Sequence, residues 1–263
     1  MRWFVLVAVL ILTVEVSAQP AIDFDQAQWS RLLAAHVTWT KDGSASVVDY
    51  AAFSKDRDGL KAYLASTSKL PKATFDAWSK VDREAFLLNV YNAATIELIL
   101  THYPDIKSIK DLGGLFGSPW KKEVISLFGD ARSLDDIEQT MLRGATDYTD
   151  PRIHFALNCA SIGCPALRPE AYLGSELTAQ LDDQAKRFLR DRSRNRFDPG
   201  KGISVSKIFD WYAEDFDKHA GGVRKFLAGY ADPLGLDANA VSNLESGTLR
   251  ISYTDYDWRL NDR

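Results

Sequence analysis

Cysteine is scarce in this chain of 263 residues, which holds only Cys159 and Cys164. Two cysteines cannot provide the disulfide framework on which small secreted proteins depend, so a packed core must stabilise the fold. The material for that core is present, because 46% of the residues are hydrophobic and 11% are aromatic. We expect one globular domain over residues 19–263.

Concentrated positive charge is also lacking. The 32 Lys and Arg residues are outnumbered by 36 Asp and Glu residues, which gives a net charge of −4. The densest basic stretch, residues 186–196, is interrupted by Asp191 and is predicted to be the solvated face of a helix. Nucleic acids and anionic membranes attract clustered Lys and Arg, so we expect no nucleic acid partner.

The longest apolar run is too short to span a membrane. Trp3–Val14 has twelve residues, which rise about 18 Å as a helix against a hydrocarbon core of ~30 Å. Arg2 precedes this run and Val16-Ser-Ala18 follows it, a pattern typical of a signal peptide over residues 1–18. We expect an exported protein, periplasmic or secreted, with no integral membrane segment after cleavage. The alternative is an uncleaved anchor at the membrane surface.

Hydrophobic periodicity predicts an α+β domain that is mainly helical around a small, mostly antiparallel sheet. Its central element is a helix over residues 82–101, which is apolar on nearly every side and must therefore be buried. A capping box at Ser133–Asp136 opens a further helix that ends at Leu142. Other helices are predicted at residues 22–37, 56–66, 74–78, 177–190, 206–216, 223–230 and 238–244. Strands are predicted at residues 124–128, 153–158 and 249–253.

Reactive side chains gather between Asp150 and Pro165. They are Arg152, His154, Asn158, Cys159, Ser161 and Cys164. We interpret residues 153–158 as a buried strand that leads into a tight turn. Alternation along a strand would point His154 and Cys159 to opposite faces, roughly 16 Å apart along the chain. His154 could then act as a base for the Cys159 thiol only if the chain turned sharply between them.

The two cysteines allow three interpretations. A Gly-Cys-Pro turn could bring Cys159 and Cys164 together as a disulfide in an exported protein. Cys159 could instead be a thiol nucleophile, or both thiols could be inert and buried. We expect no metal site, because His154 and two cysteines are too few ligands for a closed zinc site. No cofactor is implied.

Asn89 and Asn92 lie one turn apart on a buried flank of the central helix. A buried amide is stable only when it is hydrogen-bonded. One interpretation is a structural network that ties the helix to the sheet. In the other, the amides orient a substrate or a catalytic side chain beside Asn158. The aromatic stripe 209–216 is predicted to be core.

Five motifs carry a resemblance to a known family. They are Phe86–Ala93, Ser133–Glu138, His154–Ser161 with Cys164-Pro165, Ile208–Tyr212 and Tyr256–Asn261. In this order they resemble the domain of unknown function family 547, whose members are exported bacterial proteins or modules of plant and animal proteins. The resemblance implies a shared fold and no established reaction. Gln139 stands where many relatives carry histidine, and Arg259 stands where serine is commoner; glutamine cannot titrate, so a base at position 139 would be lost.

These observations predict a polar pocket near residues 152–165 that binds a small molecule or peptide. We expect its wall to include Asn89, Asn92, Arg152, His154, Asn158, Cys159 and Ser161. If the domain is an enzyme, it would be a thiol-dependent hydrolase or acyltransferase with Cys159 as nucleophile, His154 as base and the amides as oxyanion donors. The competing interpretation is a non-catalytic scaffolding module with a Cys159–Cys164 disulfide.

Overall fold

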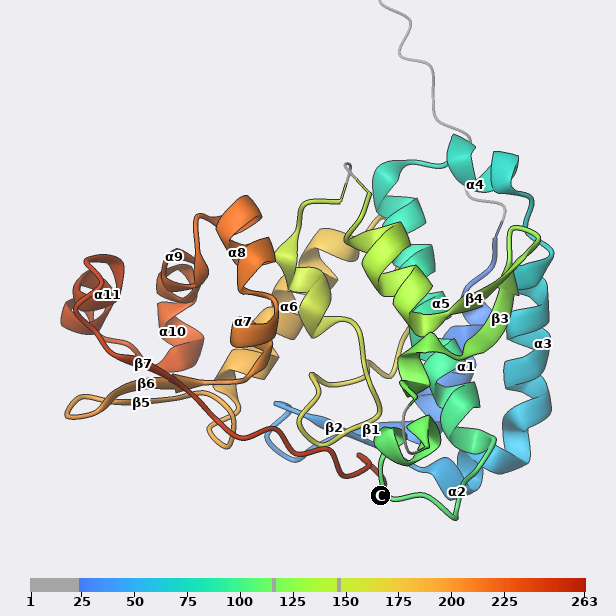
Figure 1. Ribbon diagram of the computed structural model, residues 1–263, viewed down its shortest axis with the longest axis horizontal. Helices are drawn as coiled ribbons and strands as arrows, with labels where there is room; N and C mark the ends of the chain where they lie inside the picture. The colour runs from blue at the N-terminus through green and yellow to red at the C-terminus, as the bar shows by residue number, and fades with distance from the viewer. Residues whose placement is uncertain (1–23, 115–116, 146–147) are drawn as a thin grey trace, which may run out of the picture.

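The computed structural model describes residues 24–114, 117–145 and 148–263, and the expected signal peptide lies outside them. This part of the chain is a mainly helical α+β fold, as predicted (Figure 1). The first half contributes α1 (Ala27–His36), α2 (Tyr50–Phe53), α3 (Arg57–Ser68), α4 (Lys72–Ala77) and α5 (Lys80–Leu100), with 3₁₀ turns η1 (Ser54–Asp56), η2 (Ile109–Gly113) and η3 (Pro119–Lys121).

The helix α5 is the centre of the first half, as its apolar composition predicts. Ser79 caps its N-terminus by accepting a hydrogen bond from the Asp82 N–H, and almost every side chain from Glu84 to Leu100 is buried. Glu97 is the exception and lies half-buried. It pairs with Arg57 of α3, Nη2 to Oε1 2.7 Å.

The predicted single sheet is instead three small ones. An antiparallel pair joins β1 (Val37–Trp39) to β2 (Ser46–Val48), and a second joins β3 (Glu123–Leu127) to β4 (Asp130–Ser133). The third has β6 (Gly202–Val205) between antiparallel β5 (Arg196–Asp198) and parallel β7 (Ile251–Tyr253). Phe128 and Gly129 turn the β3–β4 hairpin with φ of 58° and 89°, the positive values that a tight two-residue hairpin turn requires.

Much of the second half packs around a second hydrophobic cluster, which includes Phe155, Phe188 and Phe209, whereas Ile137 and Leu142 belong to the cluster around α5. Its elements are η4 (Asp136–Leu142), η5 (Pro151–Phe155), α6 (Leu177–Arg190), α7 (Ile208–Trp211), α8 (Ala213–Ala220), α9 (Val223–Gly229), α10 (Ala231–Leu234) and α11 (Ala238–Glu245). Figure 1 shows α7 to α11 at one end of the molecule and α1 to α5 at the other. The C-terminal tail returns from β7 to β2, where Asp262 pairs with Val48.

The strand predicted over residues 153–158 is wrong. Pro151–Phe155 is a 3₁₀ helix, because the Asp150 carboxylate accepts a hydrogen bond from the Arg152 N–H and Pro151 supplies the fixed φ of a first helical residue. The chain from Ala156 to Pro165 follows as an irregular loop, here called the disulfide loop. Alternation therefore says nothing about where His154 and Cys159 point.

The capping box at Ser133 and Asp136 is confirmed. The Ser133 N–H donates to the Asp136 carboxylate at 2.8 Å, and the Asp136 N–H donates to the Ser133 hydroxyl at 3.1 Å. The element that follows, η4, has the wider π-helical winding. None of the described helices combines the length and apolar character needed to cross a membrane.

Candidate functional site

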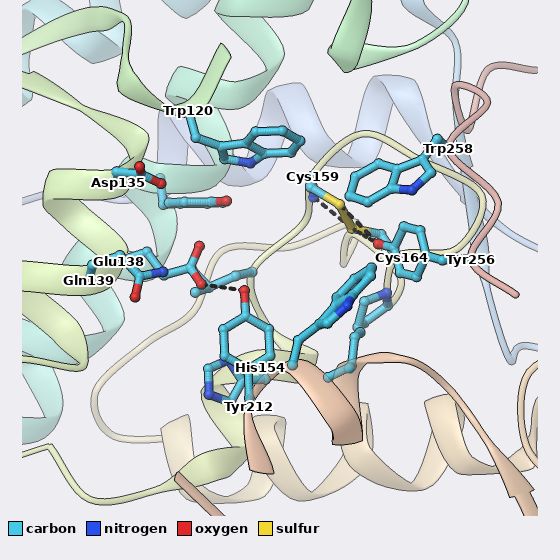
Figure 2. A pocket seen from close by; sticks show the side chains of 15 residues that line it. Trp120, Asp135, Glu138, Gln139, His154, Cys159, Cys164, Tyr212, Tyr256 and Trp258 are labelled. Carbon is cyan, nitrogen blue, oxygen red and sulfur yellow. Dashed lines mark hydrogen bonds between the residues drawn. A yellow bond between two sulfur atoms is a disulfide. The ribbon is translucent and has the colours of Figure 1, made fainter. Parts of the chain in front are cut away.

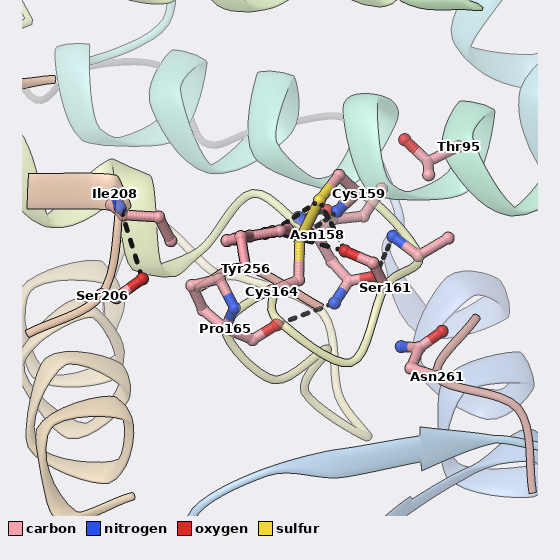
Figure 3. Close-up of a disulfide and its surroundings, with 12 residues drawn as sticks. Thr95, Asn158, Cys159, Ser161, Cys164, Pro165, Ser206, Ile208, Tyr256 and Asn261 are labelled. Atoms are coloured by element: carbon pink, nitrogen blue, oxygen red, sulfur yellow. Dashed lines mark hydrogen bonds between the residues drawn. A yellow bond between two sulfur atoms is a disulfide. The ribbon is translucent and has the colours of Figure 1, made fainter. Parts of the chain in front are cut away.

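Cys159 and Cys164 form a disulfide, with their Cα atoms 6.1 Å apart (Figure 3). Of the three interpretations of these residues, the disulfide is the one that the structure shows, and neither cysteine is a free thiol. A resting Cys159 thiolate is therefore absent from this state of the protein. The Tyr256 hydroxyl lies 3.1 Å from the Cys159 sulfur and 3.2 Å from the Cys164 sulfur.

Asn92 fastens the disulfide loop to α5. Its Nδ2 donates to the Ala156 carbonyl at 3.0 Å, and its Oδ1 accepts from the Asn158 N–H at 2.9 Å. Asn158 extends the attachment, since its Nδ2 donates to the Pro165 carbonyl and its Oδ1 accepts from the Ala160 N–H. The nitrogen and the oxygen of the Asn92 amide thus both bond backbone groups.

Asn89 does the same for another segment. Its amide donates to the Tyr172 carbonyl at 2.8 Å and accepts from the Tyr172 N–H at 2.9 Å. Both residues are no more than 2% exposed. The two amides therefore form the structural network that was one of their interpretations, although they hold loops rather than a sheet.

A cavity of ≈ 230 Å³ opens beside the disulfide (Figure 2). Side chains from both halves of the chain line it: Tyr91, Trp120, Asp135, Glu138, Gln139, His154, Leu157, Cys159, Cys164, Pro165, Ile208, Trp211, Tyr212, Tyr256 and Trp258. Figure 2 shows Asp135 and Glu138 on one side and the disulfide with Tyr256 and Trp258 on the other. No lysine or arginine belongs to this lining among the residues that the structure describes.

Three of the lining aromatic side chains form a cluster at the cavity. The Trp211 and Trp258 rings stack with centroids 5.7 Å apart, and the Tyr256 ring lies 4.5 Å from that of Trp258. Trp211 was predicted to be core, yet 46% of its surface is exposed. The prediction fails at Trp211, where α7 ends, whereas Phe209 and Phe216 belong to the hydrophobic cluster and Tyr212 packs against it.

Glu138 is buried at 5% exposure in the wall opposite the disulfide. Its carboxylate accepts a hydrogen bond of 2.7 Å from the Tyr212 hydroxyl. Burial, reinforced by the charge of Glu138, raises the pKa of Tyr212 well above its ordinary value, so this tyrosine stays a donor. Burial also raises the pKa of Asp135, while the charge of Lys121 acts in the opposite direction.

His154 reaches the cavity from η5 and is held by an ionic network. Its Nε2 lies 2.7 Å from the Asp215 carboxylate, and its ring stacks on Tyr212 with centroids 3.8 Å apart. Arg143 donates from Nε to the same carboxylate at 2.6 Å and from Nη1 to the Gln139 side chain. Burial of Asp215 acts to raise its pKa, but the hydrogen bonds from His154 and Arg143 outweigh it and hold that pKa well below its usual range.

Of the residues expected in the pocket wall, the structure brings two to the cavity, His154 and Cys159. Arg152 forms its hydrogen bonds with Asp150, through Nε at 2.9 Å. Ser161 lies behind the disulfide, where its hydroxyl donates to the Tyr256 hydroxyl at 3.3 Å. Asn89, Asn92 and Asn158 are occupied by backbone groups and are outside the lining.

Several lining residues were not anticipated from the sequence. Trp120 belongs to the single 3₁₀ turn η3, and Tyr256 and Trp258 belong to the irregular C-terminal tail. Neither segment is long enough or regular enough for a periodic pattern to indicate the direction of its side chains. One weak indication of Glu138 was present in the sequence. This carboxylate lies on the apolar side of the helix predicted after Ser133, and a carboxylate is seldom buried there without a partner. The described residues contain no group of three or more His, Cys, Asp or Glu placed to hold a metal ion.

The sequence was compared with known families, curated proteins and solved structures. No curated protein and no solved structure matches it. The Ile208–Tyr212 and Tyr256–Asn261 motifs lie beyond the one matching segment, which contains the Phe86–Ala93 and His154–Ser161 motifs. That segment, residues 75–189, matches the model of the family described as "Protein of unknown function, DUF547", which supports the resemblance drawn from the motifs.

Proposed function

We propose that this domain binds the cationic end of a small molecule or peptide in the cavity beside the disulfide. The observation that carries the proposal is the composition of the wall. Two carboxyl side chains, Asp135 and Glu138, face a group of tryptophan and tyrosine rings, and the lining described above has no Lys or Arg. Such a wall attracts positive charge and repels anions.

The aromatic rings favour an alkylated or primary ammonium group. A cation within about 6 Å of a ring centroid is attracted by the negative face of the ring, most strongly for tryptophan. Trp258 already takes part in one such contact, since the Lys110 ammonium lies 3.9 Å from its centroid. Trp120 and Trp211 offer two further rings at the same cavity.

The size of the cavity indicates that it encloses only the terminal group of a ligand and not a whole large molecule. Its volume of ≈ 230 Å³ falls below the roughly 300–1,000 Å³ of pockets that enclose drug-sized molecules. The end of a side chain or a compact amine fits this volume. The Trp211 side chain, half-exposed, would lie against the part of the ligand that emerges.

The test is a titration with tetramethylammonium chloride, followed by tryptophan fluorescence and by calorimetry at constant ionic strength. We expect saturable binding with a dissociation constant on the order of 1 mM, because two or three rings contribute about 1–2 kcal/mol each. tert-Butanol, a neutral molecule of similar shape, should give no saturable signal. Equal responses to both compounds would refute the proposal.

Two variants locate the binding. Trp211→Leu should weaken tetramethylammonium binding at least about fivefold, since it removes one ring from the wall. Tyr253→Leu is the matched control, because Tyr253 is 39% exposed and lies outside the lining. Equal losses in the two variants would mean that the signal comes from elsewhere.

We propose further that the domain functions outside the cytoplasm, in the periplasm or the surrounding medium. A Cys159–Cys164 disulfide persists in oxidising compartments and is kept reduced in the cytosol. The expected signal peptide over residues 1–18 supports the same location. Fractionation of a bacterial host that expresses the full chain tests this proposal: the product should leave the cytoplasm shortened to residues 19–263. Full-length product in the cytoplasm would contradict it.

A further inference from the structure

We infer that the Cys159–Cys164 disulfide is redox-active and accepts two electrons from a small aminothiol bound in the cavity. The choice of an aminothiol rests on the proposed cation binding, whereas the reactivity of the disulfide stands on separate observations. These observations are the access to one sulfur, the donors around the other, and the way the disulfide loop is held.

The disulfide faces the cavity rather than the core. Both cysteines belong to the lining, but Cys159 is half-buried while Cys164 is only 5% exposed. Thiol–disulfide exchange depends on which sulfur a thiolate can reach. A thiol in the cavity would therefore attack the Cys159 sulfur, and Cys164 would be the leaving group.

The Cys164 sulfur is surrounded by donors that suit a departing thiolate. The Cys159 N–H donates to it at 2.8 Å, a donor that the Cys159 sulfur lacks, and the Tyr256 hydroxyl lies between the two sulfurs, 3.2 Å from Cys164 and 3.1 Å from Cys159. Ser161 donates to the Tyr256 oxygen, which leaves the Tyr256 hydrogen free to turn to whichever sulfur becomes the anion. Donors placed around a sulfur stabilise its anion and make it a better leaving group.

The disulfide loop does not need the covalent bond to keep its shape. Asn92 and Asn158 hold one side, as described above. The C-terminal tail holds the other side, where the Ile162 N–H donates to the Arg259 carbonyl and the Asn261 N–H to the Ala160 carbonyl. A bond that closes so short a loop also restrains the unfolded chain least. The reduced and oxidised loops can therefore share one framework.

Ala160 adds a local feature of the same loop. It lies between Cys159 and Ser161 with φ of 59°, a left-handed conformation that residues with a Cβ rarely adopt. Its N–H and its carbonyl are both bonded, to the Asn158 side chain and to the Asn261 N–H. The loop is thus forced into a shape that turns the disulfide toward the cavity, and unusual backbone of this kind concentrates at functional sites.

The reaction balances as ordinary exchange. The thiolate of the aminothiol attacks the Cys159 sulfur, a bond forms between these two sulfurs, and the Cys159–Cys164 bond breaks with its electron pair on Cys164. A second aminothiol thiolate then attacks the sulfur of the first, which releases the symmetrical disulfide and the Cys159 thiolate. Two aminothiols are oxidised, one protein disulfide is reduced, and the two protein thiolates take up protons according to pH.

The charge of the wall selects among thiols. The carboxyl groups of Asp135 and Glu138 attract an ammonium and repel a carboxylate. Three reagents of similar size separate these effects: 2-aminoethanethiol, which is cationic, 2-mercaptoethanol, which is neutral, and mercaptoacetate, which is anionic. The rate of disulfide reduction by each reagent is divided by the concentration of its thiolate form. It is then divided by the rate at which the same reagent reduces the protein unfolded in urea, which removes the intrinsic reactivity of the reagent.

The reaction of the native protein with each thiol is stopped with acid, and the free protein thiols are then alkylated. The products are followed by intact mass. We expect the corrected rate to be about tenfold or more higher for 2-aminoethanethiol than for mercaptoacetate. This ratio should shrink in 1 M salt, where charges are screened. Early in the reaction, peptide mapping should find the reagent on Cys159 and the alkyl group on Cys164.

Matched variants test each part. Asp135→Asn should reduce the preference for the cationic thiol, while Glu245→Gln, an exposed carboxylate on α11, should leave it unchanged. Tyr256→Phe should slow reduction about two- to tenfold by removing a donor to the leaving sulfur, and Tyr253→Phe should not.

Two results would overturn the inference, and they are distinct. If all three thiols reduce the protein only as fast as it unfolds, the disulfide is structural and not redox-active, whatever tetramethylammonium does. If native reduction is rapid but equal for all three thiols, the aminothiol assignment fails, while the tetramethylammonium titration decides separately whether the cavity binds cations. A reagent found on Cys164 would also contradict the stated direction of attack.

Discussion

The buried amides of α5 and the polar side chains of the cavity wall are both removed from water, but they are satisfied differently. Asn89 and Asn92 each bond a carbonyl and an N–H of a neighbouring segment, so both the amide nitrogen and the amide oxygen are engaged by backbone. Glu138 and Tyr212 bond one another beside an open volume. The first pair is framework, and the second lines the cavity, where we propose that a ligand binds.

The comparison shows why buried polarity alone does not identify a site. A buried amide that meets two backbone groups is fully explained by the fold, because each unpaired group would be costly. The Glu138 carboxylate instead meets tyrosine hydroxyls at the wall of an aromatic cavity. Framework variants should therefore lose stability, and cavity variants should lose binding.

The largest contrast is expected within one helix. Phe209 and Trp211 both belong to α7, yet Phe209 is fully buried and Trp211 is 46% exposed. Phe209→Ala should lower the free energy of unfolding by about 3–5 kcal/mol, the usual result of truncating a core aromatic. Trp211→Ala should lower it by less than about 1 kcal/mol while weakening tetramethylammonium binding. Urea unfolding measures both, and similar stability losses would break the distinction.

Asn92→Ala should be the next most damaging change. It leaves the Ala156 carbonyl and the Asn158 N–H without their partner in a buried place, at about 1–3 kcal/mol for each. We expect a loss of about 2–4 kcal/mol in urea unfolding. Asn239→Ala, at an exposed position of α11, is the control and should change little. A loss below about 0.5 kcal/mol would remove Asn92 from the framework.

The elements of strong periodicity were predictable from the sequence. The prediction for α5 rested on a helix that is apolar all round, and α6 was predicted from Leu177 to Arg190, as observed. The error at residues 153–158 had a local cause. Asp150 and Pro151 form a helix start, and its effect exceeds the β tendency of the apolar residues that follow.

The cavity was only partly predictable, because it is assembled from distant segments. His154 and Cys159 lie near one another in the chain and could be singled out. Tyr256 and Trp258 reach the site only because the C-terminal tail returns along the disulfide loop, where Leu260 pairs with Ser161. No periodicity encodes that return, and it depends on tertiary packing.

Glu84 is a third polar group on α5, and it sharpens the comparison through pH. Burial, with a smaller effect of the Asp150 charge, raises the pKa of Glu84 to about 7, and its Oε1 has no hydrogen-bond partner among the described residues. A raised carboxyl pKa contributes stability that is fully present below the unfolded pKa of about 4.3 and is lost as pH rises through about 7.

Glu84→Gln should therefore be more stable than the parent protein at pH 8, by about 1–3 kcal/mol, and nearly equal to it at pH 5. Urea unfolding at the two pH values gives the difference. A variant that is less stable at pH 8 would show that the ionised carboxylate has a partner, and Glu84 would then resemble Asn92.

Gln139→His is expected to have the smallest effect on stability and a pH-dependent effect on binding. Gln139 is exposed at the cavity wall, so unfolding should change by no more than about 0.5 kcal/mol. An imidazole there would be neutral at pH 8 and cationic at pH 5.5, given an ordinary histidine pKa of about 6.5.

The positive imidazole would oppose a cation in the cavity only at the lower pH. Tetramethylammonium should then bind the variant about as well as the parent protein at pH 8 and about two- to fivefold more weakly at pH 5.5. His219 has no place in the lining, so His219→Gln is the control for unrelated histidine titration. A pH-independent variant would mean that the cation does not approach position 139, which would confine the ligand to the aromatic side of the cavity, near Trp258 and the disulfide.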